Sequence, residues 1–227
     1  MSQNRYEELE QVIGYSFIEK KHLDIAFTHK SYANEKTCVK LESYERYEYL
    51  GDAILEFLTS EYLFNNYPEK TEGELTKLRA SLVCEATLSK LARDLRLGYY
   101  GLFSKGERNT GGQNRDSILC DMFESLLGAI YNDGGLEPAR KFVETFLLTD
   151  IEHKQLFYDA KSNLQEYAQK HEKQLSYIIL EERGPDHDKE YVVQVMLNEE
   201  KGALGVGHNR KAAEQMAAFN TLNSLRA

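Results

Sequence analysis

The chain has 227 residues, of which 41% are hydrophobic and 29% charged, a composition typical of a water-soluble globular protein with one large domain or two ordinary ones. No apolar run approaches the about 18 residues that span a bilayer, and the N-terminus lacks the basic and apolar segments of a signal peptide, so we expect no membrane segment. The net charge of −9 excludes a protein that binds polyanions with its whole surface: residues 1–150 hold 18 Lys and Arg against 25 Asp and Glu, and residues 151–227 hold 10 against 12.

The three cysteines, Cys38, Cys84 and Cys120, are odd in number and widely spaced. Disulfide frameworks use even sets of cysteines, and zinc sites use cysteine or histidine pairs at short spacings. We therefore expect reduced thiols and a cytoplasmic protein.

Residues 5–35 predict two short helices, one over residues 6–13 and one ending near residue 27, with a turn at Gly14 between them. A polar connection, residues 35–43, then leads to a longer helix.

This longer helix, residues 45–64, carries acidic residues along one side. Its apolar residues recur at spacings of three and four, and at about 100° per residue Glu45, Glu48 and Asp52 fall within about 60° of one another. Like charges at this spacing repel one another, so the strip is either a solvated acidic face or a half-buried site that holds a cation. Gly51 costs the helix about 1 kcal/mol relative to alanine, which indicates that another backbone comes close to it.

Further helices are predicted over residues 71–83, 88–95, 117–130 and 136–148. A glycine-rich loop, Gly98–Gly112, separates the second of them from the third. No strand pattern occurs before residue 149, so residues 1–150 are predicted to form an all-α domain.

The rest of the chain has a different periodicity. The chain turns polar after Thr149, at Asp150 and residues 152–155, which predicts a linker over residues 151–158. Residues 159–227 begin with a helix through Leu164 and Tyr167. Alternating stretches over residues 175–180, 191–197 and 203–208 predict three strands, and an alanine-rich helix starts at Arg210. The order α-β-β-β-α predicts a small α+β domain.

A second acidic pair, Asp121 and Glu124, lies three residues apart on a helix that is otherwise apolar. Buried carboxylates are costly unless they are paired or bind a metal, so this pair either forms a salt bridge with Arg46 or Arg79 or joins a metal site. Together with Glu48 and Asp52, these acids would make an all-oxygen site that suits magnesium or manganese rather than zinc. The natural reaction at such a site is phosphoester hydrolysis.

The sequence resembles the ribonuclease III family in several segments. ERYEYLGDAIL at residues 45–55 is similar to the family signature ERLEFLGDAVL, and the resemblance continues through THKSY (28–32), GE (73–74), RA (79–80) and DMFESLLG (121–128). The combination is specific, although each piece alone would be weak.

The resemblance implies an endonuclease with the ribonuclease III fold that requires Mg²⁺, or Mn²⁺ in its place, and no organic cofactor. It would cleave double-stranded RNA, leave 5′-phosphate and 3′-hydroxyl ends, and process ribosomal RNA precursors and other structured transcripts, including messenger RNA. By the matching positions, Glu48, Asp121 and Glu124 would bind metal, Asp52 would position or activate water, and Glu45 and Glu74 would lie at the edge of the cleavage site. The alternatives are a catalytically silent regulator that binds duplex RNA and a nuclease that acts on DNA duplexes.

The chain departs from the signature at a few positions. Ser43-Tyr44 stands where His-Asn is common, and Tyr47 and Tyr49 replace Leu and Phe; we expect these changes to alter packing rather than ligands. His29 is either a general base or, in the interpretation we favour, a structural histidine bonded near Ser31.

Residues 159–227 resemble a double-stranded-RNA-binding domain. The match comprises the first helix around Gln165, the loop Gly184–His187, and Arg210 and Lys211 at the start of the last helix. Two cations at a helix N-terminus can meet phosphates, and a loop carrying His187 can reach 2′-hydroxyls in the minor groove. Alternatively, each of these is an ordinary surface residue. Three cations either contact RNA or keep the glycine-rich loop soluble: Lys105 and Arg108 within the loop, and Arg115 just beyond it.

Cleavage of both strands of a duplex predicts a homodimer with two-fold symmetry. The expected interface is Gly51 together with the aromatic and aliphatic face of the helix that carries it.

Overall fold

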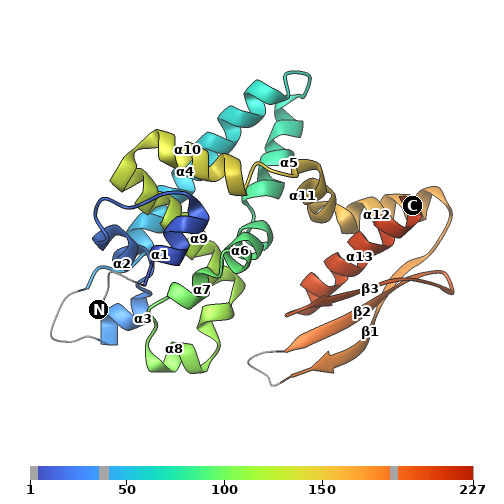
Figure 1. Cartoon of the computed structure of the whole chain (residues 1–227). Coiled ribbons are helices and arrows are strands. Elements are labelled where there is room, and N and C mark those ends of the chain that lie inside the picture. The colour runs from blue at the N-terminus through green and yellow to red at the C-terminus, as the bar shows by residue number, and fades with distance from the viewer. Residues whose placement is uncertain (1–4, 36–40, 185–188, 227) are drawn as a thin grey trace. The chain divides into compact units, whose positions relative to one another are not determined.

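The computed structural model describes residues 5–35, 41–184 and 189–226. The chain divides into two compact units, residues 1–149 and residues 150–227 (Figure 1). The helices of the first unit are α1 (Glu7–Ile13), α2 (Lys21–Ala26), α3 (Lys30–Glu35), α4 (Glu45–Asn66), α5 (Glu72–Val83), α6 (Glu85–Asp94), α7 (Leu97–Tyr100), α8 (Lys105–Asn109), the 3₁₀ turn η1 (Gly112–Asn114), α9 (Asp116–Gly134) and α10 (Leu136–Phe146).

Helix α9 forms the centre of the first unit. Its residues from Met122 to Ile130 are buried except for Glu124, and α2, α4, α6 and α10 all pack against it. A helix that is apolar nearly all round is stable only when other helices cover it, which explains why the sequence places amphipathic helices on either side of it.

Helices α4 and α9 cross unusually closely because each contributes a glycine to the contact. A Cβ atom at Gly51 would overlap the carbonyl oxygen of Glu124, and a Cβ at Gly128 would overlap the carbonyl oxygen of Tyr47. The predicted close approach of a backbone to Gly51 is therefore confirmed. The expectation that Gly51 lies in a dimer interface is wrong, because the residue is buried against α9 of its own chain.

The all-α character predicted for the first domain is confirmed, since its described residues contain no strand beyond a single bridge between Thr28 and Leu102. The prediction of one irregular loop over Gly98–Gly112 is wrong in detail. This stretch contains α7, α8 and η1, whose short length leaves too few turns for a periodic apolar pattern.

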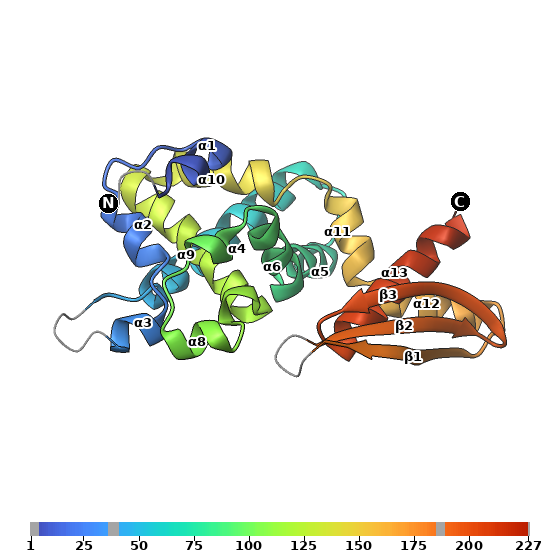
Figure 2. The same cartoon turned by 60° about the horizontal axis from the view of Figure 1, so that its bottom comes forward.

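The second unit comprises α11 (Ile151–Tyr158), α12 (Ala160–Lys170), β1 (Leu175–Arg183), β2 (Glu190–Leu197), β3 (Glu200–Gly207) and α13 (Arg210–Arg226). The strands form an antiparallel sheet in the order β1-β2-β3, and α12 and α13 cover one face of it (Figure 2). Gly205 lets α13 lie directly on β3, because a Cβ there would overlap the backbone of Ala213 and Ala217. The predicted α-β-β-β-α order is thus confirmed.

The segment predicted as a linker, residues 151–158, is helical. This helix, α11, packs on α13: the Phe157 and Phe219 ring centroids are 5.5 Å apart, and the Gln215 side-chain amide donates to the Tyr158 carbonyl at 2.8 Å. Every helix in the described part of the chain is too short or too polar to cross a membrane.

Candidate metal centre and RNA-binding surface

Three of the predicted acids converge where α4 crosses α9. Glu48 comes from α4, and Asp121 and Glu124 come from successive turns of α9. Each offers a carboxylate oxygen, and these oxygens lie within 4.8 Å of one another. The close crossing at Gly51 and Gly128 brings the two helices near enough for their carboxylates to share one centre.

Burial raises the pKa of all three carboxyls. For Glu124 the loss of water, followed by the charges of Asp52, Asp121 and Glu48, raises the pKa to about 8. Burial and the charge of Asp121 raise the pKa of Glu48, and burial also raises that of Asp121 although the Tyr44 hydroxyl opposes it. A free site of this kind is partly protonated near neutral pH, and a bound cation would displace that proton.

The salt bridges considered as an alternative are not formed. Among the residues the structure describes, neither Arg46 nor Arg79 pairs with Asp121 or Glu124, and Arg79 instead binds Glu56 at 2.8 Å. The carboxylates therefore lack the neutralising partner that a purely structural role would require.

The donor set fits a hard divalent cation. Oxygens bound to one Mg²⁺ at about 2.1 Å lie roughly 3 to 4 Å apart, so small side-chain rotations would bring the three oxygens onto one ion. The absence of histidine and cysteine from the cluster disfavours zinc. Glu48, Asp121 and Glu124 are thus the residues that would hold the metal.

The other predicted acids lie at different distances from this centre. Asp52 is exposed one turn beyond Glu48, close enough for its charge to raise the pKa of Glu124. Glu45 lies at the start of α4, where Lys30 approaches it at 3.3 Å, and its charge acts on Glu48. The structure therefore brings both residues to the edge of the cluster.

Glu74 is engaged elsewhere. Its carboxylate accepts hydrogen bonds from the backbone N–H and the hydroxyl of Thr71, at 2.8 and 2.7 Å, and completes a capping box at the start of α5. These hydrogen bonds lower the pKa of Glu74. The structure of one chain thus gives Glu74 a role in helix capping and does not bring it into the cluster.

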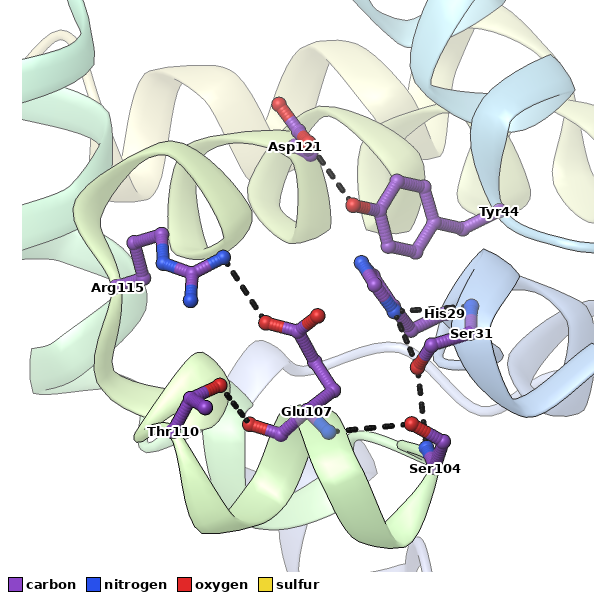
Figure 3. A network of polar contacts seen from close by, with 8 residues as sticks. All are labelled: His29, Ser31, Tyr44, Ser104, Glu107, Thr110, Arg115 and Asp121. Carbon is purple, nitrogen blue, oxygen red and sulfur yellow. Dashed lines mark hydrogen bonds and ion pairs between the residues drawn. The ribbon is translucent and has the colours of Figure 1, made fainter.

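Tyr44 belongs to the site although the sequence assigned it only to packing. Its hydroxyl donates to Asp121 Oδ2 at 2.9 Å, and its ring lies against His29, with centroids 5.7 Å apart (Figure 3). Burial, together with the charge of Asp121, raises the pKa of Tyr44, so the hydroxyl keeps its proton and remains a donor. The signal that could have found it is the aromatic residue standing where the family has Asn, directly before the acidic helix.

His29 has the structural role that we favoured. Its ring is buried, Nδ1 accepts from the Ser31 backbone N–H at 3.1 Å and lies 2.8 Å from the Ser31 hydroxyl, and Ser31 in turn accepts from the Ser104 N–H (Figure 3). Burial lowers the pKa of His29, so the ring is neutral at physiological pH.

Of the three cations in and just after the glycine-rich segment, two form contacts within the fold. Arg115 pairs with Glu107 at 2.9 Å, and Arg108 donates to the Gly101 carbonyl at 3.2 Å. Lys105 is exposed at the start of α8. Arg108 and Arg115 therefore stabilise this segment, whatever else they contact.

The predicted RNA-binding residues of the second unit lie at the ends or on the surface of helices. Gln165 is exposed on α12, and Lys211 is exposed in the first turn of α13. Arg210 shares Glu214 with Lys161, at 2.7 and 2.6 Å. His187 lies outside the described residues.

Comparison with known proteins agrees with this architecture. A family model described as Ribonuclease-III-like matches residues 19–151, and one described as Double-stranded RNA binding motif matches residues 160–225. The ribonuclease 3 of Geobacillus kaustophilus is 45% identical over 98% of this chain and 92% of its own length, and that of Shouchella clausii is 44% identical over 97% and 86%.

A solved structure is also similar. The nuclease domain of the Campylobacter jejuni ribonuclease III, studied for flexibility in a region involved in dimer formation, is 40% identical and covers 63% of this chain and 96% of its own, with a TM-score of 0.59. The two family models together span the residues of the carboxylate cluster and of the small sheet. The chain therefore belongs to the ribonuclease III family.

Proposed function

We propose that this protein is a magnesium-dependent endoribonuclease that cleaves double-stranded RNA at the cluster of Glu48, Asp121 and Glu124. The observation that carries the proposal is the convergence of these three half-buried carboxylates without an ion-pair partner among the described residues. Such a site gains stability when a divalent cation neutralises it. Manganese has the same preference for oxygen and would substitute for magnesium.

The proposed roles of the side chains rest on the family resemblance and are supported by their positions. When bound, Mg²⁺ would lower the pKa of a water molecule and polarise the scissile phosphate. Asp52, exposed one turn from Glu48, would accept a hydrogen bond from the attacking water and orient it. Attack of the water oxygen on phosphorus would break the bond to the ribose 3′-oxygen. The water loses a proton as it attacks and the 3′-oxygen gains one as it leaves, so the products carry 5′-phosphate and 3′-hydroxyl ends. Glu45 lies at the edge of the cluster, and its negative charge raises the pKa of Glu48.

The second unit binds the duplex. Exposed Lys211 and the N-terminus of α13 offer positive charge to phosphates, and Gln165 on α12 offers an amide to the minor groove. By its position in the family motif, His187 is proposed to contact 2′-hydroxyls of the RNA. Because only two cations, Arg210 and Lys211, are assigned to RNA contact, the affinity for RNA should be moderate and salt-dependent.

The active form is proposed to be a homodimer, because the two strands of a duplex are antiparallel and one cluster cuts one strand. Tyr49, Phe57 and Phe64 are 81%, 52% and 72% exposed and lie on one side of α4, away from Gly51. Tyr49 also lines a cleft of about 480 Å³, together with Arg46 and Leu50. Sedimentation of only monomer at micromolar concentration would contradict this assembly.

The free thiols of Cys84 and Cys120 support a cytoplasmic location, where thiols stay reduced. Precursors of ribosomal RNA and structured messenger RNA are the proposed substrates, since both contain long duplexes.

Incubation of a long RNA duplex with Mg²⁺, with Mn²⁺ and with a chelator, resolved on a gel, tests the proposal. We expect cleavage with either metal and none with the chelator. A DNA duplex of the same sequence serves as the control and should remain intact. Binding of the RNA without cleavage under every condition would instead identify a catalytically silent regulator.

A further inference from the structure

Tyr44 contacts both helices that build the metal centre. Its hydroxyl donates to Asp121 Oδ2 of α9, and its backbone carbonyl accepts the N–H groups of Tyr47 and Glu48, at 2.8 and 2.9 Å, as the first hydrogen bonds of α4. One residue therefore fixes the start of the helix that carries Glu48 and the orientation of the carboxylate that faces it.

The aromatic ring of Tyr44 is itself held firmly. The side chain is 2% exposed, its backbone N–H donates to the Thr28 carbonyl at 2.9 Å, and its ring packs on His29, which packs on Phe103 with centroids 5.4 Å apart. Ser31 ties this layer to Ser104 at the start of α8 (Figure 3). Because the Tyr44 ring is held in this way, its hydroxyl restricts the orientation of the Asp121 carboxylate to which it donates.

The hydrogen bond occupies one of the two oxygens of Asp121. Because Oδ2 is engaged by Tyr44, Oδ1 has more freedom to meet a cation, and the carboxylate is favoured as a ligand through one oxygen. Small divalent cations such as Mg²⁺ accept this mode, whereas Ca²⁺ often takes both oxygens of a carboxylate.

We infer that Tyr44 is a positioning residue of the metal centre: its hydroxyl holds Asp121 in the orientation that binds a divalent cation. The inference rests on the proposed function, since it concerns the same cluster. It also revises the expectation that a residue other than Asn at this position changes packing alone.

The test compares two tyrosine-to-phenylalanine variants of the full chain. Tyr44→Phe removes the bond to Asp121 and keeps the ring against His29. Tyr6→Phe is the matched control, because Tyr6 is also buried in the first unit and donates to a carboxylate, Asp24 Oδ1 at 3.1 Å, outside the cluster. Binding of Mn²⁺ is measured by its electron paramagnetic resonance signal without RNA, and cleavage is measured over a range of Mg²⁺ concentrations.

We expect Tyr44→Phe to weaken Mn²⁺ binding about tenfold, the lower end of the range for groups that orient a ligand. The Mg²⁺ concentration for half-maximal cleavage should rise by a similar factor, and the rate at saturating Mg²⁺ should return to within about threefold of the unaltered chain. Tyr6→Phe should change metal binding less than twofold. A larger Ca²⁺ to Mg²⁺ affinity ratio in Tyr44→Phe would further support the role of the occupied oxygen.

Equal metal affinities in Tyr44→Phe and Tyr6→Phe would overturn the inference and leave the proposed function intact. A rate that stays low in Tyr44→Phe at saturating Mg²⁺ would also overturn it, because a lost orientation of the ligand is recovered by excess metal. Failure of the unaltered chain to bind Mn²⁺ or cleave RNA would instead contradict the proposed function itself.

Discussion

In the first unit, Glu48, Asp121 and Glu124 face one another without an ion pair among the described residues, whereas in the second unit Glu214 is shared by Lys161 and Arg210. Both regions remove carboxylates from water, yet the consequences are opposite. Burial and neighbouring acids raise the pKa of Glu124 to about 8. Burial also acts on Glu214, but the hydrogen bonds from its two cations outweigh it and lower the pKa.

The difference shows which region needs a partner. The second unit neutralises its buried acid with its own cations, so we expect the RNA to meet cations that are already arranged. The first unit keeps its repulsion, and a divalent cation would relieve it. Unrelieved repulsion between half-buried carboxylates therefore indicates a metal centre better than the number of acidic residues does, because the chain has many acidic residues.

The largest effect is expected from Glu124→Gln. The variant removes a ligand and the repulsion together, so cleavage should fall by about 10³-fold or more, which corresponds to the several kcal/mol that a metal contributes to catalysis. RNA binding in Ca²⁺, measured by filter retention, should remain within about threefold. A variant that cleaves at the rate of the unaltered chain would remove Glu124 from the metal centre.

The close packing of α4 against α9 can be disrupted by a substitution that leaves every charge unchanged. Gly51→Ala would place a methyl group against the backbone of Glu124, so we expect it to lower the free energy of unfolding by about 3 kcal/mol. Gly73→Ala is the control, because no atom lies within 4 Å of a Cβ there, and it should be neutral or stabilising by about 0.5 kcal/mol. Urea denaturation followed by circular dichroism compares the two; equal stabilities would contradict the close crossing.

The raised pKa of Glu124 predicts how metal-free stability depends on pH. The folded state keeps the proton up to about pH 8, whereas the unfolded state loses it near 4.5, so the folded state binds more protons between these values. The contribution to stability is complete below pH 4.5 and is lost as the pH rises to about 8, with a slope of at most about 1.4 kcal/mol per pH unit.

Thermal unfolding in a chelator measures this slope, and Glu124→Gln is its control, since the amide does not titrate. The difference in melting temperature between the two proteins should change across that pH window. With Mg²⁺ present the trend should reverse, because the metal binds the deprotonated form. A constant difference at every pH would show that Glu124 titrates normally.

The sequence predicted the helices and acids that repeat within one element. The three and four spacing of α4 and α9 gave both helices and the acidic positions, and Gly51 correctly indicated a close backbone. The bond between Tyr44 and Asp121 joins residues 77 positions apart, and no local periodicity encodes such a contact. Only the packing of α4 against α9 in three dimensions brings the two residues together.

Glu74 carries a local signal that the family resemblance does not use. Thr71 followed three residues later by Glu74 is the capping-box pattern, and the structure contains that box. The resemblance implies that Glu74 lies at the edge of the cleavage site, and this role stays a prediction that the capping box of one chain does not test. A motif match therefore needs to be weighed against the helix-end chemistry of the same residues.

The smallest effects are expected from the cations of α13, and they sharpen the contrast between a paired and an exposed charge. Lys211→Ala should weaken binding to an RNA duplex about three- to fivefold and reduce the salt dependence by roughly one counterion, because Lys211 is exposed in the first helical turn. Arg210→Ala should weaken binding less, since Arg210 shares its charge with Glu214 and Lys161 retains that carboxylate. Titrations at several salt concentrations measure both variants; a larger loss from Arg210→Ala would mean that RNA releases Arg210 from Glu214 and that the second unit is not fully arranged before it binds.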